Sequence, residues 1–277
     1  MSTYACSDLH GNLELTKKIL NYLKSDDTLY FLGDSVDRGD NGIEVFNLFY
    51  NDPRVIFLKG NHEDLMARAI PYVYAEIEDP ALCYYNNRFY QDWYYNGGNK
   101  TSKAFYNMTK EEVFKIRDII NELPTNCEYH SPKGHYVILE HAGYTPFDIP
   151  HRSHDPLWDR EHFEDNWYGW GLNGSDYQND FNPKNVYLVH GHTPVHFLKY
   201  EYNYWGKPKM TAEDMIEKRK FMRDEPMNFK EKIIRYCDGH KFDIDMGSAY
   251  SGRAALLDLD TFEPIYFDEE ENKDENR

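Results

Sequence analysis

The segment TLYFLGDSVDRGD, residues 28–40, decides how this chain folds. It begins with aromatic and aliphatic residues that are typical of a buried strand, and it breaks at a glycine into acidic residues and an arginine. The same arrangement precedes it, where TYAC (3–6) leads into SDLHGN (7–12), and follows it, where RVIFL (54–58) leads into KGNHED (59–64). Each of these three short strands therefore ends in a loop that is rich in Asp, Asn or His.

Between these strands the apolar residues recur every three or four positions, which is the spacing of one face of a helix. LELTKKILNYLK (13–24) and GIEVFNLFY (42–50) show this spacing, and EDLMARAI (63–70) begins a third helix. Strands that alternate with helices in this way predict βαβ crossovers and parallel neighbouring strands. The predicted fold class is therefore α/β.

The middle of the chain has a different character, because residues 66–130 are mostly helix-forming and aromatic. A helix is predicted from Thr109 onwards, since Thr109 and Glu112 have the spacing of a capping box. WYYNGGNKT (93–101) is predicted to be a turn between helices.

Strand-forming segments return later in the chain, at YVILEHAGY (136–144), NVYLVHGHTPV (185–195), FDIDMGSAYSGRAALLDLD (242–260) and PIYF (264–267). Residues 198–235 between them are charged and helix-prone, with Thr211 and Asp214 as a candidate cap. We predict a single domain over residues 1–267 with helical inserts at about 66–130 and 198–235. The acidic tail, 268–277, is expected to be frayed.

Composition excludes several classes of protein. Apolar residues make up 40% of the chain, as in a protein with a packed core, and the formal net charge of −17 argues against non-specific nucleic-acid binding. No apolar run approaches the roughly 20 residues of a membrane span, and the N-terminus does not resemble a secretory leader. The chain has four cysteines and no CxxC pair: Cys6, Cys83, Cys127 and Cys237. This pattern indicates reduced thiols, and we expect a cytoplasmic protein.

Polar residues gather directly after five of the predicted strands. They are Asp8 and His10; Asp34, Asp37 and Arg38; Asn61 and His62; His141; and His190 and His192. In an open α/β sheet, ligands bind at the carboxyl ends of the strands. We therefore expect the five loops to share one edge of the sheet and to bring these side chains together.

This set of side chains suits a pair of divalent metal ions. Carboxylates, imidazoles and an amide oxygen favour Mn²⁺, Fe or Zn²⁺ over soft ions, and the set is too large for one closed zinc site. Asp8 and His10 lie on the same side of an extended segment and can share one metal, while Asp34 is placed to bridge two. Two metals would activate a hydroxide for attack on a phosphoester.

The neighbouring residues complete this chemistry. Arg38 can bind a phosphate through two hydrogen bonds, and His62 can protonate the leaving oxygen if Asp37 holds its tautomer. Each motif alone also has an ordinary explanation as a turn or a buried histidine, but the ordered set of five favours a di-metal hydrolase. The remaining histidines are interpreted as surface or structural residues: His130, His135, His151, His154, His162, His196 and His240.

The motifs SDLHGN, GDSVDRG, KGNHED, HAG and GHTP, in this order, resemble the signature of the calcineurin-like metallophosphoesterases. GDSVDRG and GNHE are similar to the phosphoprotein phosphatase branch, in its bacterial and bacteriophage lambda type, which is close to the symmetrical diadenosine tetraphosphatases. The closing segment 243–260 resembles their I-D-x-G-x-x-x-G-R-L-x-A-L pattern. The resemblance is good over 4–65, 139–160, 187–195 and 243–260, loose in the middle, and nearly absent in 198–235.

The resemblance implies two packed mixed β-sheets flanked by helices, with a di-metal site at the carboxyl ends of the strands. It implies two divalent ions, with Mn²⁺ as the first choice and Fe, Zn or Ni as alternatives. Asp8, His10 and Asp34 would hold one ion, and the second would be held by Asp34, Asn61, His141 and His192. His62 would be the general acid, Asp37 its partner, and Arg38 and Arg160 would bind phosphate. His190, which the period of an extended strand puts on the face of His192, has a supporting role left open.

The implied activity is hydrolysis of a phosphomonoester by direct attack of metal-activated hydroxide, without a covalent phosphoenzyme. We expect a serine/threonine protein phosphatase that acts on a phosphoprotein or a small phosphoester, with neither nucleic acid nor a membrane as partner. A dinucleoside polyphosphate hydrolase is the alternative. A catalytically inactive scaffold is a second alternative, against which the retention of His62, Asp37 and Arg38 speaks. The inserts are expected to shape substrate choice, and the oligomeric state is left open.

Overall fold

The computed structural model describes residues 1–78, 87–143, 155–160, 185–196, 232–237 and 239–269. Most of the predicted insert 198–235, with its candidate cap at Thr211 and Asp214, lies outside the described residues, as do His151, His154, His162 and most of the acidic tail.

The first sheet is built around the strands that the opening sequence motifs predict. Its order is β10-β9-β1-β2-β3, and the strands are β1 (Thr3–Cys6), β2 (Thr28–Phe31), β3 (Val55–Phe57), β9 (Arg253–Asp258) and β10 (Pro264–Asp268). β1, β2 and β3 are parallel, as predicted, while β9 and β10 are antiparallel to their neighbours. The carboxyl ends of β1, β2 and β3 therefore lie at one edge.

The second sheet has the same mixed design, in the order β4-β5-β6-β8-β7. Its strands are β4 (Asn126–His130), β5 (Tyr136–Glu140), β6 (Val186–His190), β7 (Ile234–Tyr236) and β8 (Lys241–Asp243). β5, β6 and β8 run parallel, and β4 and β7 are antiparallel edge strands. β4 lies at the end of the stretch 66–130, which was predicted to be mostly helical, and limits that prediction. Its exposed polar residues, Asn126, Glu128 and His130, alternate with the half-buried Cys127 and Tyr129, so β4 lacks the apolar run of a central strand.

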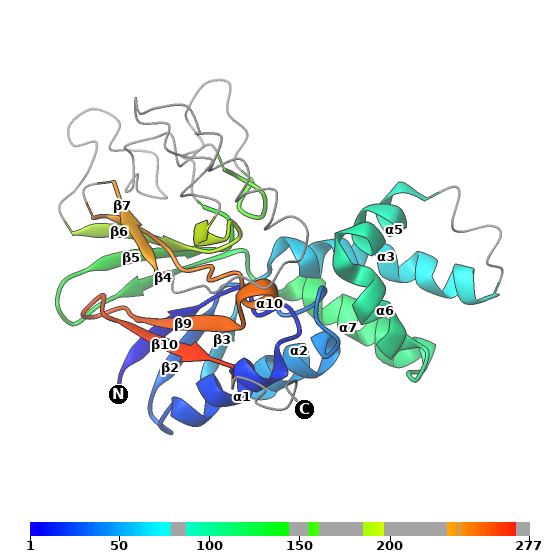
Figure 1. The fold of residues 1–277 in the computed structure, drawn as a ribbon, viewed down its shortest axis with the longest axis horizontal. Coiled ribbons are helices and arrows are strands. Elements are labelled where there is room, and N and C mark those ends of the chain that lie inside the picture. The colour runs from blue at the N-terminus through cyan, green and yellow to red at the C-terminus, as the bar shows by residue number, and fades with distance from the viewer. Residues whose placement is uncertain (79–86, 144–154, 161–184, 197–231, 238, 270–277) are drawn as a thin grey trace, which may run out of the picture.

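The two sheets pack face to face (Figure 1). Ala5 and Leu32 at the first sheet meet Val137, Val189 and Phe242 of the second in one buried cluster. The predicted arrangement of two mixed sheets flanked by helices is therefore confirmed. The expectation that all five polar loops follow strands of one sheet is wrong, because β5 and β6, which precede His141 and His192, belong to the second sheet. Packing brings the ends of the two sheets together instead.

Helices cover the outer face of the first sheet. They are α1 (Leu13–Tyr22), α2 (Gly42–Asn51) and α3 (Asn61–Glu78), and α7 (Lys110–Glu122) packs against α3. The Asn12 side chain accepts a hydrogen bond from the first turn of α1, and the predicted capping box of Thr109 and Glu112 opens α7. Phe31 is fully buried here and stacks on Phe49 at 4.2 Å between ring centroids. Truncating such a ring to alanine costs about 3–5 kcal/mol.

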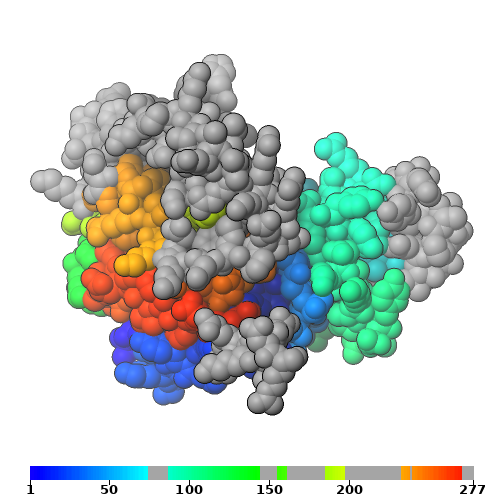
Figure 2. All heavy atoms as spheres, viewed as in Figure 1, coloured from blue at the N-terminus to red at the C-terminus, as the bar shows by residue number. Residues whose placement is uncertain are grey.

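A further helical segment projects from the sheets with α7, coloured cyan to green in Figures 1 and 2. It consists of α5 (Arg88–Trp93), the π-helical turn η1 (Tyr94–Gly98) and α6 (Asn99–Phe105). The prediction of a turn at 93–101 is therefore wrong in part. The chain stays helical through η1, except at Gly97, whose φ of 109° kinks it. The short helix α10 (Ser248–Ser251) precedes β9.

Among the described residues, no helix has both the length and the apolar character that a membrane span requires. The assignment of residues 1–267 to a single domain stays a prediction.

Candidate active site

The candidate site residues share an unusual backbone conformation. Eight non-glycine residues in the described part of the chain have positive φ, and six of them belong to the predicted site: Asp8 (55°), His10 (43°), Asp34 (61°), Asp37 (69°), Arg38 (62°) and His192 (69°). This region of φ is costly for residues with a side chain and persists where the surroundings enforce it. The strand-end loops therefore adopt a strained backbone, and their side chains converge on one another.

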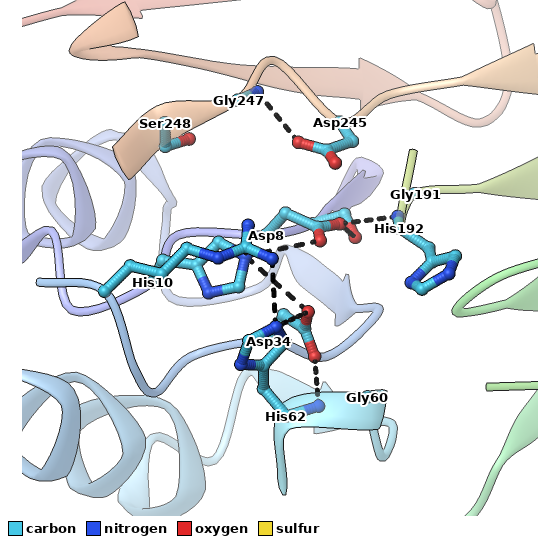
Figure 3. A network of polar contacts seen from close by, with 12 residues as sticks. Asp8, His10, Asp34, Gly60, His62, Gly191, His192, Asp245, Gly247 and Ser248 are labelled. Atoms are coloured by element: carbon cyan, nitrogen blue, oxygen red, sulfur yellow. Dashed lines mark hydrogen bonds and ion pairs between the residues drawn. The ribbon is translucent and has the colours of Figure 1, made fainter. Parts of the chain in front are cut away.

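The first group of candidate metal ligands comes from the first sheet. His10 donates its Nδ1 hydrogen to the carbonyl of Val36 at 2.9 Å, which leaves Nε2 for a ligand. That nitrogen lies 3.8 Å from Asp8 Oδ1 and 3.6 Å from Asp34 Oδ2. Figure 3 shows these side chains converging together with His62. The predicted first set, Asp8, His10 and Asp34, is thus brought together.

The second group joins both sheets. His141 donates Nδ1–H to the carbonyl of Leu32 at 2.8 Å, so its Nε2 presents a lone pair to Asn61 Oδ1 at 2.8 Å. Two lone pairs at this distance repel each other unless a cation lies near them. His141 Nε2 is also 3.5 Å from Asp34 Oδ1, and Nδ1 of His192 is 3.0 Å from Asn61 Oδ1. Asp34 therefore belongs to both groups.

The buried polar atoms support occupation by cations. Asp8 Oδ1 and His192 Nε2 are buried and have no hydrogen-bond partner among the described residues, which is rare for polar atoms in a protein interior. Burial, followed by the charges of Asp8 and Glu63, raises the pKa of Asp34 well above its usual value. Divalent cations would offset this crowding of carboxylates. The donor set fits two such ions with Asp34 between them.

His62 lies close enough to this cluster to be compared with the ligands. His10, Asp34 and His62 form one group of potential donor atoms within 4.8 Å of one another, and Asp8, Asp34 and His141 form another. His62 Nε2 is 3.9 Å from Asp34 Oδ2, while its backbone N–H donates to Asp34 Oδ1 at 2.9 Å. Its location therefore agrees both with a residue beside the metals and with a ligand.

The partners of His62 distinguish it from the other imidazoles. Its Nδ1–H donates to Asp37 Oδ2 at 2.8 Å, and its Nε2 accepts from Arg38 Nη2 at 3.0 Å. Arg38 Nη1 lies 2.7 Å from His10 Nε2, so the guanidinium spans the two rings. Burial, followed by the charge of Arg38, lowers the pKa of His62 well below its usual value. Asp37, Arg38 and His62 thus meet as predicted.

Glu63 is a site residue that the motif reading left without a role. Its fully buried carboxylate accepts hydrogen bonds from the backbone N–H groups of Asp34 (2.8 Å), Ser35 (2.7 Å) and Gly60 (2.9 Å). It thereby joins the loop after β2 to the start of α3. The available signal was its place as third residue of α3, where an acidic side chain reaches back to the helix start.

Gly191 allows the second sheet to approach the first. A Cβ at this position would collide with Ser7 Oγ and Asp8 Oδ2. The next residue, His192, donates its backbone N–H to Asp8 Oδ2 at 3.0 Å, a contact drawn in Figure 3. The candidate ligand His192 is therefore positioned by its backbone as well as by its ring.

His190 does not face the candidate ligands. Its Nε2 accepts a hydrogen bond from the Tyr236 hydroxyl at 2.7 Å, and its Nδ1–H donates to the Gly191 carbonyl at 3.1 Å. Burial lowers the pKa of His190 to about 3, so the ring is neutral. The positive φ of His192 breaks the alternation on which the same-face expectation was based. His190 instead supports the loop that carries His192.

Arg160 lies beside the second group of ligands. Its Nε–H donates to Thr193 Oγ1 at 3.1 Å, and its charge contributes to lowering the pKa of His192, after burial and His141. The neighbouring Trp158 is 42% exposed and meets the His192 ring edge-on at 5.7 Å between centroids. Arg160 therefore lies near His192, whereas Arg38 lies near His10 and His62.

Comparison with known proteins identifies relatives of the kind that these motifs indicate. The profile described as calcineurin-like phosphoesterase matches residues 1–240. The chain is 43% identical over 72 residues to serine/threonine-protein phosphatase rdgC of Drosophila melanogaster, a match that covers 23% of this chain and 11% of that protein. It is 36% identical over 75 residues to symmetrical bis(5'-nucleosyl)-tetraphosphatase of Xylella fastidiosa (strain 9a5c), covering 25% and 26%.

Each of these two matches therefore spans only a limited part of the relative's length. Among solved structures, a metallophosphoesterase from Sphaerobacter thermophilus aligns with a TM-score of 0.48 and 14% identity, over 98% of this chain and 88% of that one. The family profile covers most of the chain, including all ten residues at the strand ends. The chain therefore belongs to the calcineurin-like phosphoesterase family.

Proposed function

We propose that the protein is a metal-dependent phosphomonoester hydrolase and, more narrowly, a serine/threonine protein phosphatase. The observation that carries this proposal is the sharing of Asp34 between two sets of inward-facing donors, with the hydrogen-bonded pair of Asp37 and His62 directly beside them. This is the arrangement needed to bind a phosphate, attack it with water, and protonate the leaving oxygen.

Asp8, His10 and Asp34 would hold one divalent ion, and the second would be held by Asp34, Asn61, His141 and His192. When bound, such ions lower the pKa of a coordinated water and polarise the phosphoryl group. Mn²⁺ is the ion we propose, with Fe, Zn or Ni as alternatives, because carboxylate, imidazole and amide donors accept all of these.

Arg38 and His62 would act on the two sides of the phosphate. In the structure, Arg38 donates hydrogen bonds to the unprotonated Nε2 atoms of His10 and His62. A phosphate dianion would draw the guanidinium into a charge-assisted pair of hydrogen bonds and release His62 Nε2. His62 could then carry a proton at Nε2, stabilised by Asp37 at Nδ1, and deliver it to the leaving alkoxide. Arg160 would provide a further positive charge.

Two substrate classes follow from the relatives. The stretch similar to rdgC is more nearly identical than the stretch similar to the tetraphosphatase, which supports a phosphoserine or phosphothreonine protein. The net charge of −17 also disfavours long-range attraction of a polyphosphate. The dinucleoside polyphosphate hydrolase remains the second candidate, because the Xylella protein is similar over a comparable length.

The test is a comparison of substrates on the purified full chain. With Mn²⁺ it should hydrolyse p-nitrophenyl phosphate, and EDTA should stop the reaction. In parallel assays a phosphothreonine peptide should give the higher kcat/KM than diadenosine tetraphosphate. The reverse order would select the polyphosphate hydrolase, and no turnover with any divalent ion would support the inactive scaffold.

A further inference from the structure

We infer that Trp93 and Thr101 are positioning residues that hold the Asp37 carboxylate in the orientation in which it supports His62. This inference rests on the proposed function of His62 as a general acid. It assigns a mechanistic role to the ends of WYYNGGNKT (93–101), a stretch outside the strand-end motifs.

Thr101 contacts Asp37 twice. Its hydroxyl accepts a hydrogen bond from the backbone N–H of Asp37 at 2.9 Å, and it lies 2.7 Å from Asp37 Oδ1. A hydroxyl has only one hydrogen, and a carboxylate oxygen can only accept it. Because the backbone N–H already acts as donor to this oxygen, the hydroxyl hydrogen is directed to Oδ1. Thr101 therefore fixes both the backbone and the side chain of Asp37.

Trp93 adds a second donor to the same carboxylate oxygen. Its indole N–H donates to Asp37 Oδ1 at 3.0 Å, while the other oxygen, Oδ2, accepts from His62 Nδ1 at 2.8 Å. Asp37, Trp93 and Thr101 are all at most 1% exposed. With Oδ1 occupied by two donors, rotation of the carboxylate away from His62 would leave buried donors unsatisfied, which costs about 1–3 kcal/mol for each group.

The π-helical turn η1, between Trp93 and Thr101, explains how these two residues reach Asp37. Gly97 accepts a hydrogen bond from the Arg38 backbone N–H at 3.2 Å, and a Cβ on Gly97 would come within 2.8 Å of Arg38. A Cβ on Gly98 would collide with the Trp93 indole. The two glycines therefore let the helical segment pack closely on the Asp37–Arg38 turn, while His62 binds the other oxygen of the Asp37 carboxylate.

The variant that tests this inference is Thr101→Val, which keeps the shape and removes the hydroxyl. With phenyl phosphate, whose leaving phenolate needs a proton, kcat should fall roughly 10-fold, a fraction of the 10²–10⁴ attributed to a general acid. With 2,4-dinitrophenyl phosphate, whose leaving group departs without a proton, the change should be less than about twofold. Trp93→Phe should show the same contrast, and Thr101→Ser should restore the wild-type rate.

Two controls separate positioning from general damage. The Ser102 hydroxyl, in the same helix as Thr101, donates to the Asn99 carbonyl and does not contact Asp37. Ser102→Ala should therefore leave kcat unchanged with both phenyl phosphate and 2,4-dinitrophenyl phosphate. In a His62→Asn background, Thr101→Val should have no further effect on phenyl phosphate, because its contribution passes through His62. Equal losses with both substrates, an undiminished loss in the His62→Asn background, or loss of bound Mn²⁺ in Thr101→Val would overturn the inference.

The failure of the proposed function would look different. If the wild-type protein with Mn²⁺ hydrolysed neither substrate, the proposed function would fail, and this inference with it. An active wild type whose Thr101→Val variant shows no dependence on the leaving group would overturn the inference alone.

Discussion

The two halves of the candidate active site are constructed differently. The metal-ligand half is assembled from the ends of strands in both sheets, and its side chains face one another across short distances. In the acid half, Asp37 with His62, the Asp37 carboxylate is held by Trp93 and Thr101 of a helical segment that projects from the sheets (Figure 1). We therefore expect metal binding to depend on the sheet framework, and the orientation of the proposed acid to depend on the insert.

The largest effect is expected where the two metal groups meet. Asp34→Asn replaces one oxygen of the carboxylate that both groups share, so turnover with p-nitrophenyl phosphate should fall by more than roughly 10³-fold. Added Mn²⁺ should not restore the turnover of this variant, whereas the wild-type protein, after EDTA has removed its metal, should regain its turnover when Mn²⁺ is added. Asp40→Asn, an exposed residue six positions later that pairs with Lys100, is the matched control and should remain active. A variant that kept a tenth of the wild-type rate would show that Asp34 does not bridge metals.

The next effect belongs to the acid half. His62→Asn should lower kcat for phenyl phosphate by roughly 10²–10⁴, the usual contribution of a general acid. The loss with p-nitrophenyl phosphate should be smaller, because that leaving group needs less protonation. Steady-state kinetics on the two substrates measure this contrast, with the exposed His130→Asn as control. Equal losses on both substrates would argue against a proton donor.

Glu63 connects the halves, and its substitution should act on stability. Glu63→Gln would turn an amide NH₂ towards backbone N–H groups that now donate to a carboxylate, at a cost of about 2–4 kcal/mol in the free energy of unfolding. Urea denaturation of the metal-free protein measures the change. Glu111→Gln, at an exposed position of α7, should change stability little. A cost below about 0.5 kcal/mol for Glu63→Gln would mean that the two loops hold each other without it.

The smallest predicted effect concerns the support of the metal half in the second sheet. The pKa of His190 is lowered by burial from 6.5 to about 3, so the folded state resists a proton that the unfolded state accepts. Stability from this residue is fully present above the unfolded pKa and declines as pH falls below it. At pH 5 the loss is about 2 kcal/mol.

That loss can be isolated by comparing variants. The free energy of unfolding of the metal-free protein, measured at pH 7 and pH 5, should fall more in wild type than in His190→Asn. If acidification lowers the free energy of unfolding equally in both proteins, His190 is not held neutral by the fold. Its hydrogen bond with Tyr236 would then not be what supports the loop that carries His192.

The sequence predicts the convergence of the metal half well because each candidate ligand follows within a few residues of a strand. Asp8, Asp34 and Asn61 lie within a few residues of β1, β2 and β3, and parallel strands bring such positions together. The division between two sheets was not readable from this pattern, since a strand does not record which sheet it joins. β4 is hard to predict for a related reason, because an edge strand in which every second residue is polar has no apolar run.

The acid half was only partly predictable. Trp93 and Thr101 are 56 and 64 residues from Asp37 in sequence, and neither carries a charge that marks a functional residue. The paired glycines predict a turn, whereas in the structure they allow close packing inside a helical segment. His190 shows the converse limit, since the assumed alternation of a strand fails as soon as His192 adopts a positive φ.

The central claim is that His62 stays off the metals although it lies beside them. The number of Mn²⁺ ions bound by His62→Asn, determined by isothermal titration and elemental analysis, tests this claim most directly. The account predicts two ions per chain in both wild type and variant, with affinities within roughly threefold of each other. Loss of one ion, or an affinity more than about 10-fold weaker, is the effect of disturbing a ligand sphere and would contradict the account.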